Sequence, residues 1–175
     1  DTDTDRYLAS LLSPSEKRRA LVALYAYNAE LARVRDSVHE PLPGEVRLQY
    51  WRDLLDGTEH GSTQANPLAA ELQAAIRDHR LPVGPLTAMS EARIFDLYDD
   101  PMETTQMFEG YAGETSSALI QLAALVLDRK AAEGAFEPDQ RTDPPGAAEP
   151  DQQLGQVFDG AGVADGDHHL DLVIR

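Results

Sequence analysis

Three polar residues in one segment of the chain, Asn28, Arg35 and Asp36, could together bind a charged ligand. An arginine guanidinium forms planar, bidentate hydrogen bonds to phosphate oxygens, and a carboxylate can hold a divalent cation. Asn28 falls within an apolar series, so its amide would be buried and would need hydrogen-bonding partners. We therefore predict that these three side chains face a shared polar cavity from neighbouring turns of one helix.

Simpler interpretations of the nearby charges stay open. Glu30, Arg33 and Asp36 follow one another at three-residue spacing, which is also typical of solvated ion pairs worth about 0.3–0.5 kcal/mol each. Arg47 and Arg52 could line an anion site, but a solvated helix face explains them equally simply.

The acidic residues further along the chain also have two interpretations. Asp96, Asp99 and Asp100 are spaced like a metal-binding motif, and Arg93 lies three residues before Asp96. Asp99 and Asp100 come where a predicted helix ends, however, and acids there oppose the helix dipole. We therefore favour a structural Arg93–Asp96 pair and a capping role for Asp99 or Asp100.

Two features concern packing more than ligand binding. Tyr50 and Trp51 are expected in the core, because large aromatic side chains bury more apolar area than most others. Gly110 and Gly113 each cost a helix roughly 1 kcal/mol relative to alanine. Two glycines in one predicted helix indicate either close helix packing or room for a ligand.

Helices must position these residues, because apolar side chains recur at three- and four-residue spacing. The predicted helices run from Ser13 to about Glu40, from Gly44 to Leu55, from Asn66 to shortly before Leu81, from Pro85 to about Tyr98, and from the Asp100–Thr105 region to about Val126. Ser13 and Glu16 are predicted to form a capping box at the first start. Apart from a faint run over residues 170–174, no segment alternates with period two. The predicted fold is all-α, an antiparallel helical bundle.

Composition narrows the class of protein. The net charge of −16 argues against unassisted binding to nucleic acid. No apolar run approaches the ~20 residues that span a bilayer, although peripheral membrane contact stays open. The chain has no cysteine, so it has no disulfide. It begins at Asp1 and not at a methionine, and we interpret it as a processed or excised fragment. We expect a cytoplasmic protein.

The acidity concentrates at the end of the chain. Residues 131–175 carry ten Asp or Glu and two Arg, half of the net charge, and are rich in Pro and Gly. Their few apolar side chains do not offset the entropy of ordering so long a segment. We therefore predict a helical domain over residues 1–128 and an irregular acidic tail over 129–175. Alternatively, the chain is a truncated remnant, and residues 131–175 are an ending unrelated to the helical domain.

The order of four motifs resembles the squalene/phytoene synthase family over roughly Asp5 to Asp128. These motifs are Tyr25-Ala26-Tyr27, Trp51-Arg52, Arg93-Ile94-Phe95-Asp96-Leu97 and Tyr111-Ala112-Gly113-Glu114-Thr115-Ser116-Ser117-Ala118. The resemblance implies the N-terminal half of the isoprenoid synthase fold. It also implies a pocket for a prenyl diphosphate, lined by Asn28, Arg35, Asp36, Arg52 and Arg93. Where such a diphosphate binds, Mg²⁺ would accompany it, with Asp36 as the candidate metal ligand.

The sequence departs from the family pattern at its carboxylates. Ala32 and Arg33 fall where the family has its leading aspartates, only Asp36 is kept, and the second aspartate motif has no counterpart. Condensation of two prenyl diphosphates is therefore not expected, and any activity would be prenyl transfer of the family type. The departures resemble a non-carotenogenic branch that includes a respiratory complex I assembly factor. That resemblance implies the alternative function, a non-catalytic binding or assembly factor with a protein partner.

Overall fold

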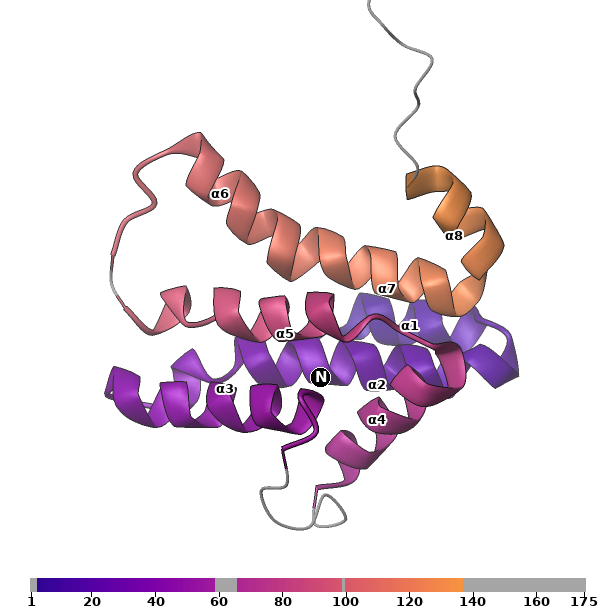
Figure 1. Ribbon diagram of the computed structural model, residues 1–175, viewed down its shortest axis with the longest axis horizontal. Helices are drawn as coiled ribbons and strands as arrows, with labels where there is room; N and C mark the ends of the chain where they lie inside the picture. Colours follow the sequence, from indigo (N-terminus) through magenta and orange to yellow (C-terminus); the bar gives the residue numbers. More distant parts are fainter. Residues whose placement is uncertain (1–2, 59–65, 99, 137–175) are drawn as a thin grey trace, which may run out of the picture. The chain divides into compact units, whose positions relative to one another are not determined.

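Helices make up all the regular structure in the part of the chain described by the computed structural model, residues 3–58, 66–98 and 100–136 (Figure 1). The α-helices are α1 (Thr4–Leu12), α2 (Ser15–Ala32), α3 (Pro41–Leu55), α4 (Pro67–His79), α5 (Val83–Ala92), α6 (Thr105–Ala112), α7 (Ala118–Leu127) and α8 (Arg129–Phe136). Two short 3₁₀ turns, η1 (Arg35–Ser37) and η3 (Phe95–Leu97), and a π-helical turn, η4 (Gly113–Ser117), complete the elements. The predicted all-α fold is confirmed.

Helix α2 is the centre of the packing. It contacts α1, α4 and α7, while α3 contacts α5 (Figure 1). Its buried residues are Ala20, Leu21, Ala23, Leu24, Tyr27, Asn28 and Leu31. Each fully buried leucine contributes about 1.5–3 kcal/mol of hydrophobic stabilisation, so this face fixes the position of α2 among its neighbours.

Local chemistry explains several helix ends. The Asn66 side chain accepts hydrogen bonds from the backbone N–H groups of Leu68 (3.1 Å) and Ala69 (3.3 Å), so it caps α4 as its position before Pro67 suggests. Thr104 caps α6 in the same way by accepting from Met107 N–H (3.1 Å). The cap of α6 is therefore Thr104, and the predicted capping role is wrong for Asp100. Asp99 lies outside the described residues.

The predicted helix from Ser13 to Glu40 is wrong at both ends. Ser13 closes α1, because its N–H donates to the Ser10 carbonyl (3.2 Å) and its hydroxyl donates to the Ala9 carbonyl (3.2 Å). Helix α2 begins two residues later with no side-chain cap, so the capping box is absent. Helix α1 itself, capped by Asp3, was not predicted.

At its other end, α2 stops at Ala32 and not at Glu40. Val34 N–H bonds to the Leu31 carbonyl (3.2 Å), which tightens the backbone toward 3₁₀ geometry. The Ser37 hydroxyl then donates to the Val34 carbonyl (2.8 Å) and competes with the helical pattern. Val38 and Glu40 are extended before Pro41, which begins α3.

Two further boundaries differ from the prediction. Helix α5 ends at Ala92 and is followed by η3, so the region up to Tyr98 is not one continuous helix. Helix α8 lies beyond Asp128, which extends the helical part to Phe136. Residues 137–175, the rest of the predicted irregular tail, lie outside the described residues. No helix within the described ranges combines the length and apolar character needed to cross a membrane.

Candidate functional site

Asn28 lies in the interior, as predicted. It is on α2 and only 9% exposed. Its side-chain Oδ1 is buried and has no hydrogen-bond partner within the described part of the chain. An unpartnered buried carbonyl costs about 1–3 kcal/mol, so the Asn28 side chain lowers the free energy of unfolding. Ligand binding by Asn28 stays a prediction.

Asp36 does not share that interior position. Because α2 ends at Ala32, Arg35 and Asp36 lie on η1, where helical periodicity no longer aligns them with Asn28. Asp36 is exposed, and Arg35 is half-buried. The prediction that Asn28, Arg35 and Asp36 all face one cavity is therefore wrong for Asp36.

Mg²⁺ binding at Asp36, the candidate metal position, stays a prediction. Magnesium requires several oxygen ligands in near-octahedral geometry. Among the described residues, no group of three or more His, Cys, Asp or Glu side chains is arranged to hold a metal ion. Asp36 offers a single carboxylate on an exposed turn.

Arg52 lies on α3 between polar partners. Its side chain is 21% exposed, its guanidinium is 3.9 Å from the Glu91 carboxylate of α5, and it donates to the Gln49 side chain. The Arg52 Nε is buried without a partner among the described residues. This residue therefore keeps one unused donor inside the protein.

Arg93, Asp96 and Tyr111 form a closed hydrogen-bonded cluster. Arg93 Nη1 donates to Asp96 Oδ2 (3.0 Å) and to the Tyr111 hydroxyl (2.7 Å), and that hydroxyl donates to Asp96 Oδ1 (2.7 Å). Arg93 and Asp96 are 17% and 24% exposed. The structural Arg93–Asp96 pair is confirmed, and Tyr111, which sequence reasoning had not placed there, completes it.

This cluster predicts a loss of stability at alkaline pH. Burial, followed by the hydrogen bond to Asp96, raises the pKa of Tyr111 to about 12. Because this pKa exceeds the unfolded value of about 10, the stabilisation is complete below pH 10 and is lost as pH rises toward 12. Urea denaturation between pH 9 and 11.5 should show the unfolding free energy falling. Burial also raises the pKa of Tyr27, so Tyr111→Phe should flatten this fall without abolishing it. An unchanged slope in Tyr111→Phe would contradict the assignment.

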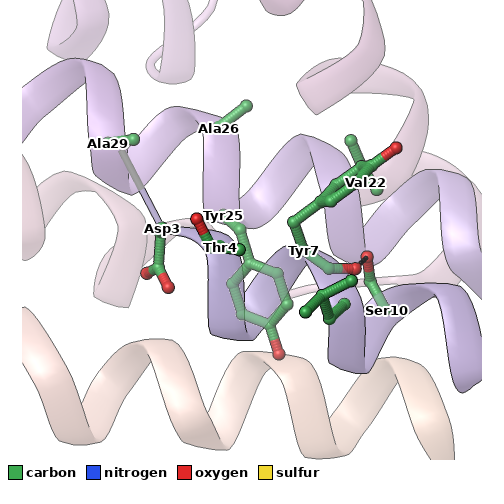
Figure 2. Close-up of a pocket in the computed structure, with 9 residues that line it drawn as sticks. Asp3, Thr4, Tyr7, Ser10, Val22, Tyr25, Ala26 and Ala29 are labelled. Carbon is green, nitrogen blue, oxygen red and sulfur yellow. Dashed lines mark hydrogen bonds between the residues drawn. The ribbon is translucent and has the colours of Figure 1, made fainter. Parts of the chain in front are cut away.

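An apolar groove lies between α1 and α2, and we call it the α1–α2 groove. One part, about 410 Å³, is lined mainly by Tyr7, Leu8, Val22, Tyr25 and Ala26 (Figure 2). A second part of about 580 Å³ shares Tyr7, Val22 and Ala26 and continues toward α4. Tyr7 and Leu8 are 54% and 53% exposed. The groove was not predicted because α1 was not predicted.

The ends of this groove are held by polar contacts. The Ser10 hydroxyl donates to the Tyr7 carbonyl (2.7 Å; Figure 2). Arg18 donates to the carbonyls of Leu11 (2.8 Å) and Ser13 (3.2 Å), which fixes the corner between the two helices. Arg19 is paired with Glu71 of α4. None of the five predicted ligand-binding residues lines this groove.

Comparison with known proteins now decides the family. The family model described as squalene/phytoene synthase matches residues 1–164.

The chain belongs to the squalene/phytoene synthase family.

Its curated relatives include proteins named "NADH dehydrogenase (ubiquinone) complex I, assembly factor 6". The Bos taurus protein is 37% identical and the Homo sapiens protein 35% identical, each over 128 residues that cover 73% of this chain and 38% of the relative. The Drosophila melanogaster homolog is 30% identical over 130 residues, 69% of this chain and 37% of the relative. The chain thus spans less than two fifths of the length of these relatives. No solved structure matches it.

The squalene/phytoene synthase motifs meet in two places in the structure. The ring of Tyr27, from the first motif, packs edge-on against Trp51, from the second, with centroids 5.2 Å apart. Arg93, from the third motif, contacts Tyr111, from the fourth. Trp51 is 4% exposed, so its predicted place in the core is confirmed.

Close packing does not explain Gly110 and Gly113. A Cβ atom built on Gly110 or Gly113 would meet no other atom within 4 Å in the described structure. The alternative, that the glycines leave room for a ligand, stays a prediction. Gly113 begins the π-helical turn that joins α6 to α7.

Proposed function

We propose that the chain is a non-catalytic binding factor that takes part in assembling a respiratory enzyme of the complex I type. The observation that carries this proposal is the relationship to proteins named complex I assembly factor 6 or its homolog, at 30–37% identity over 128–130 residues. The cytoplasmic, membrane-peripheral location expected from the sequence belongs to the same proposal.

The arrangement of the charged residues favours this function over prenyl transfer. A departing diphosphate needs its negative charge neutralised by metal ions, which carboxylates hold in place, and by free cationic side chains. Ala32 and Arg33 supply no metal-binding carboxylate, and Asp36 is exposed. The guanidinium of Arg93 is already engaged by Asp96 and Tyr111. These observations support a binding role better than prenyl transfer.

The α1–α2 groove is the surface that we assign to the protein partner. Exposed apolar side chains that gather on one face are typical of protein interaction sites. The groove is lined by Tyr7, Leu8, Leu11 and Val22, which are all at least 37% exposed. The occupant that fits is an amphipathic helix of a partner subunit, whose aliphatic side chains would enter the groove.

Capture of the partner with variants of the groove tests this function. The tagged chain is expressed in cells that assemble a complex I-like enzyme, and co-purified subunits of that enzyme are quantified by mass spectrometry. Leu8→Asp places a charge in the groove and should reduce recovery of those subunits at least about tenfold, or ~1.4 kcal/mol. Leu42→Asp is the matched control, because Leu42 lies on α3 and is 69% exposed.

Two results would contradict the proposal. Equal recovery by Leu8→Asp and Leu42→Asp would show that the groove is not the interaction surface. No enrichment of complex I subunits by the unmodified chain would show that these subunits are not its partner. Release of pyrophosphate from farnesyl or geranylgeranyl diphosphate with Mg²⁺, together with a C30 or C40 product, would restore the catalytic alternative.

A further inference from the structure

A second cleft, lined by none of the residues of the four motifs, gathers basic side chains from three helices. It has a volume of about 510 Å³. Lys17 comes from α2, His79 and Arg80 from the end of α4, and Arg129 and Lys130 from the start of α8. Such a concentration of positive charge is unexpected in a chain with a net charge of −16. We call it the basic cleft.

The acids of the basic cleft are engaged elsewhere. Asp78 pairs with Arg77 (3.0 Å), and Asp128 Oδ1 accepts the backbone N–H of Ala131 (3.1 Å) at the start of α8. Lys17, Arg80 and Lys130, by contrast, form no ion pair within the ranges that the structure describes. Three cations therefore stay available to a ligand.

Arg129 has a structural task in this cleft. Its Nη2 donates to the carbonyls of His79 (2.7 Å) and Arg80 (3.0 Å), and its Nη1 donates to Glu133 (2.9 Å). These bonds join the end of α4 to the start of α8. They satisfy carbonyl groups that the helix end would otherwise leave unpaired.

Arg80 has an unusual backbone conformation. Its φ of 50° and ψ of 42° are left-handed, and among the described residues no other non-glycine residue has a positive φ. Glycine or asparagine usually fills this position at a helix end, because a larger L-residue is strained there. A residue keeps such a conformation only where the surrounding structure fixes it, and residues of this kind cluster at functional sites.

The electrostatic environment of His79 is consistent with a positive cleft. Burial lowers the pKa of the His79 imidazole, and the positive charge of Lys17 lowers it further, with a smaller contribution from Arg129 that opposes the effect of Asp78. A phosphate bound beside these cations would reverse the effect of their charge on the imidazole. His79 is therefore a natural spectroscopic reporter of anion binding.

We propose that the basic cleft binds a phosphate group, either as free inorganic phosphate or as the headgroup of an anionic lipid. Arg80 and Lys130 contact the phosphate oxygens, Lys17 adds charge from α2, and Arg129 holds the backbone that carries Arg80. Leu127, which is 46% exposed, also lines the cleft and provides an apolar edge. The site does not depend on the protein partner proposed above.

The test uses the full chain and two probes. Inorganic phosphate is titrated while the His79 imidazole resonance, assigned with His79→Gln, is followed by NMR. Binding to vesicles of phosphatidylcholine with and without phosphatidylglycerol is measured by sedimentation. A saturable shift with phosphate and no preference for anionic vesicles identifies free phosphate as the ligand. A shift together with selective binding to phosphatidylglycerol vesicles identifies the lipid headgroup.

Variants separate binding from folding. Arg80→Gly removes the guanidinium while relieving the left-handed strain, so the protein should fold at least as well but bind about tenfold more weakly. Lys130→Gln should weaken binding in the same direction. Arg33→Gln is the matched control: it removes the same charge from an exposed position outside the cleft. No shift and no selective vesicle binding, or equal affinity in Arg80→Gly and Arg33→Gln, would overturn the proposal.

Discussion

Replacing Trp51 with alanine is expected to destabilise the protein by about 3–5 kcal/mol, a large part of the total stability of a domain of this size. Trp51 is 4% exposed, and its ring packs edge-on against both Tyr27 and Tyr50, at centroid distances of 5.2 and 5.3 Å. Alanine would leave a cavity between α2 and α3 and would remove both aromatic contacts. Urea denaturation followed by far-ultraviolet circular dichroism measures the effect without relying on the fluorescence of the chain's one tryptophan.

Two variants serve as controls for the Trp51 prediction. Trp51→Phe keeps an aromatic ring and should cost clearly less than alanine, because part of the cavity is filled. Leu42→Ala, also on α3 but 69% exposed, should change stability by no more than about 0.5 kcal/mol. A loss below 1 kcal/mol in Trp51→Ala would mean that the second motif does not anchor the core.

Replacing Asn28 with leucine is expected to raise stability by about 1–2 kcal/mol. The buried Oδ1 of Asn28 has no partner among the described residues, so its desolvation is uncompensated. An apolar side chain with the same number of heavy atoms and the same branching removes that cost and adds hydrophobic contact with the α2 core. Chemical denaturation of the variant and of the unmodified chain measures the difference directly.

Asn28→Asp provides the opposite change at nearly constant volume. A buried, unpaired carboxylate should destabilise the protein by a few kcal/mol at neutral pH and less once acid protonates it. If Asn28→Leu lost stability instead, Oδ1 would have to be satisfied by water or by a bound molecule. Recovery of complex I subunits by Asn28→Leu would then show whether the amide contributes to the partner interaction.

The site residues fall into two groups with different physical roles. Arg93 is satisfied by Asp96 and Tyr111, so its charge stabilises the local structure and is not free for an incoming anion. Asn28 and Arg52 each keep an unpartnered buried polar atom. A ligand-binding role for these two residues stays a prediction.

Much of the local structure follows from the sequence. Three- and four-residue apolar spacing identifies the helices, and a residue such as Asn66 before Pro67 marks a helix start through hydrogen bonds two and three residues away. The resemblance to squalene/phytoene synthases follows from the order of short motifs, and the match over residues 1–164 confirms it. An interaction between residues a few positions apart depends mainly on the types of those residues, so the sequence is enough to predict it.

The end of α2 shows where that reasoning fails. Apolar spacing continues from Leu31 through Val34 to Val38, as it would in a helix, and Val34 is buried. The backbone nevertheless tightens into η1, because a hydrogen bond from Ser37 replaces the helical pattern. The spacing of apolar residues does not reveal the change from α-helix to 3₁₀ turn. The position of the Asp36 side chain depends on that change.

Sequence alone determined the helical class and the starts of α4 and α6, because these depend on residues within about one helical turn of each other. The order of the short motifs along the chain determined the family. Tertiary structure decided the three features that carry the functional proposals. Tyr111 reaches Arg93 across 18 positions, Arg129 reaches His79 across 50, and the α1–α2 groove exists only once α1 folds back on α2. Contacts over such separations arise from packing of whole helices, and no local spacing specifies them.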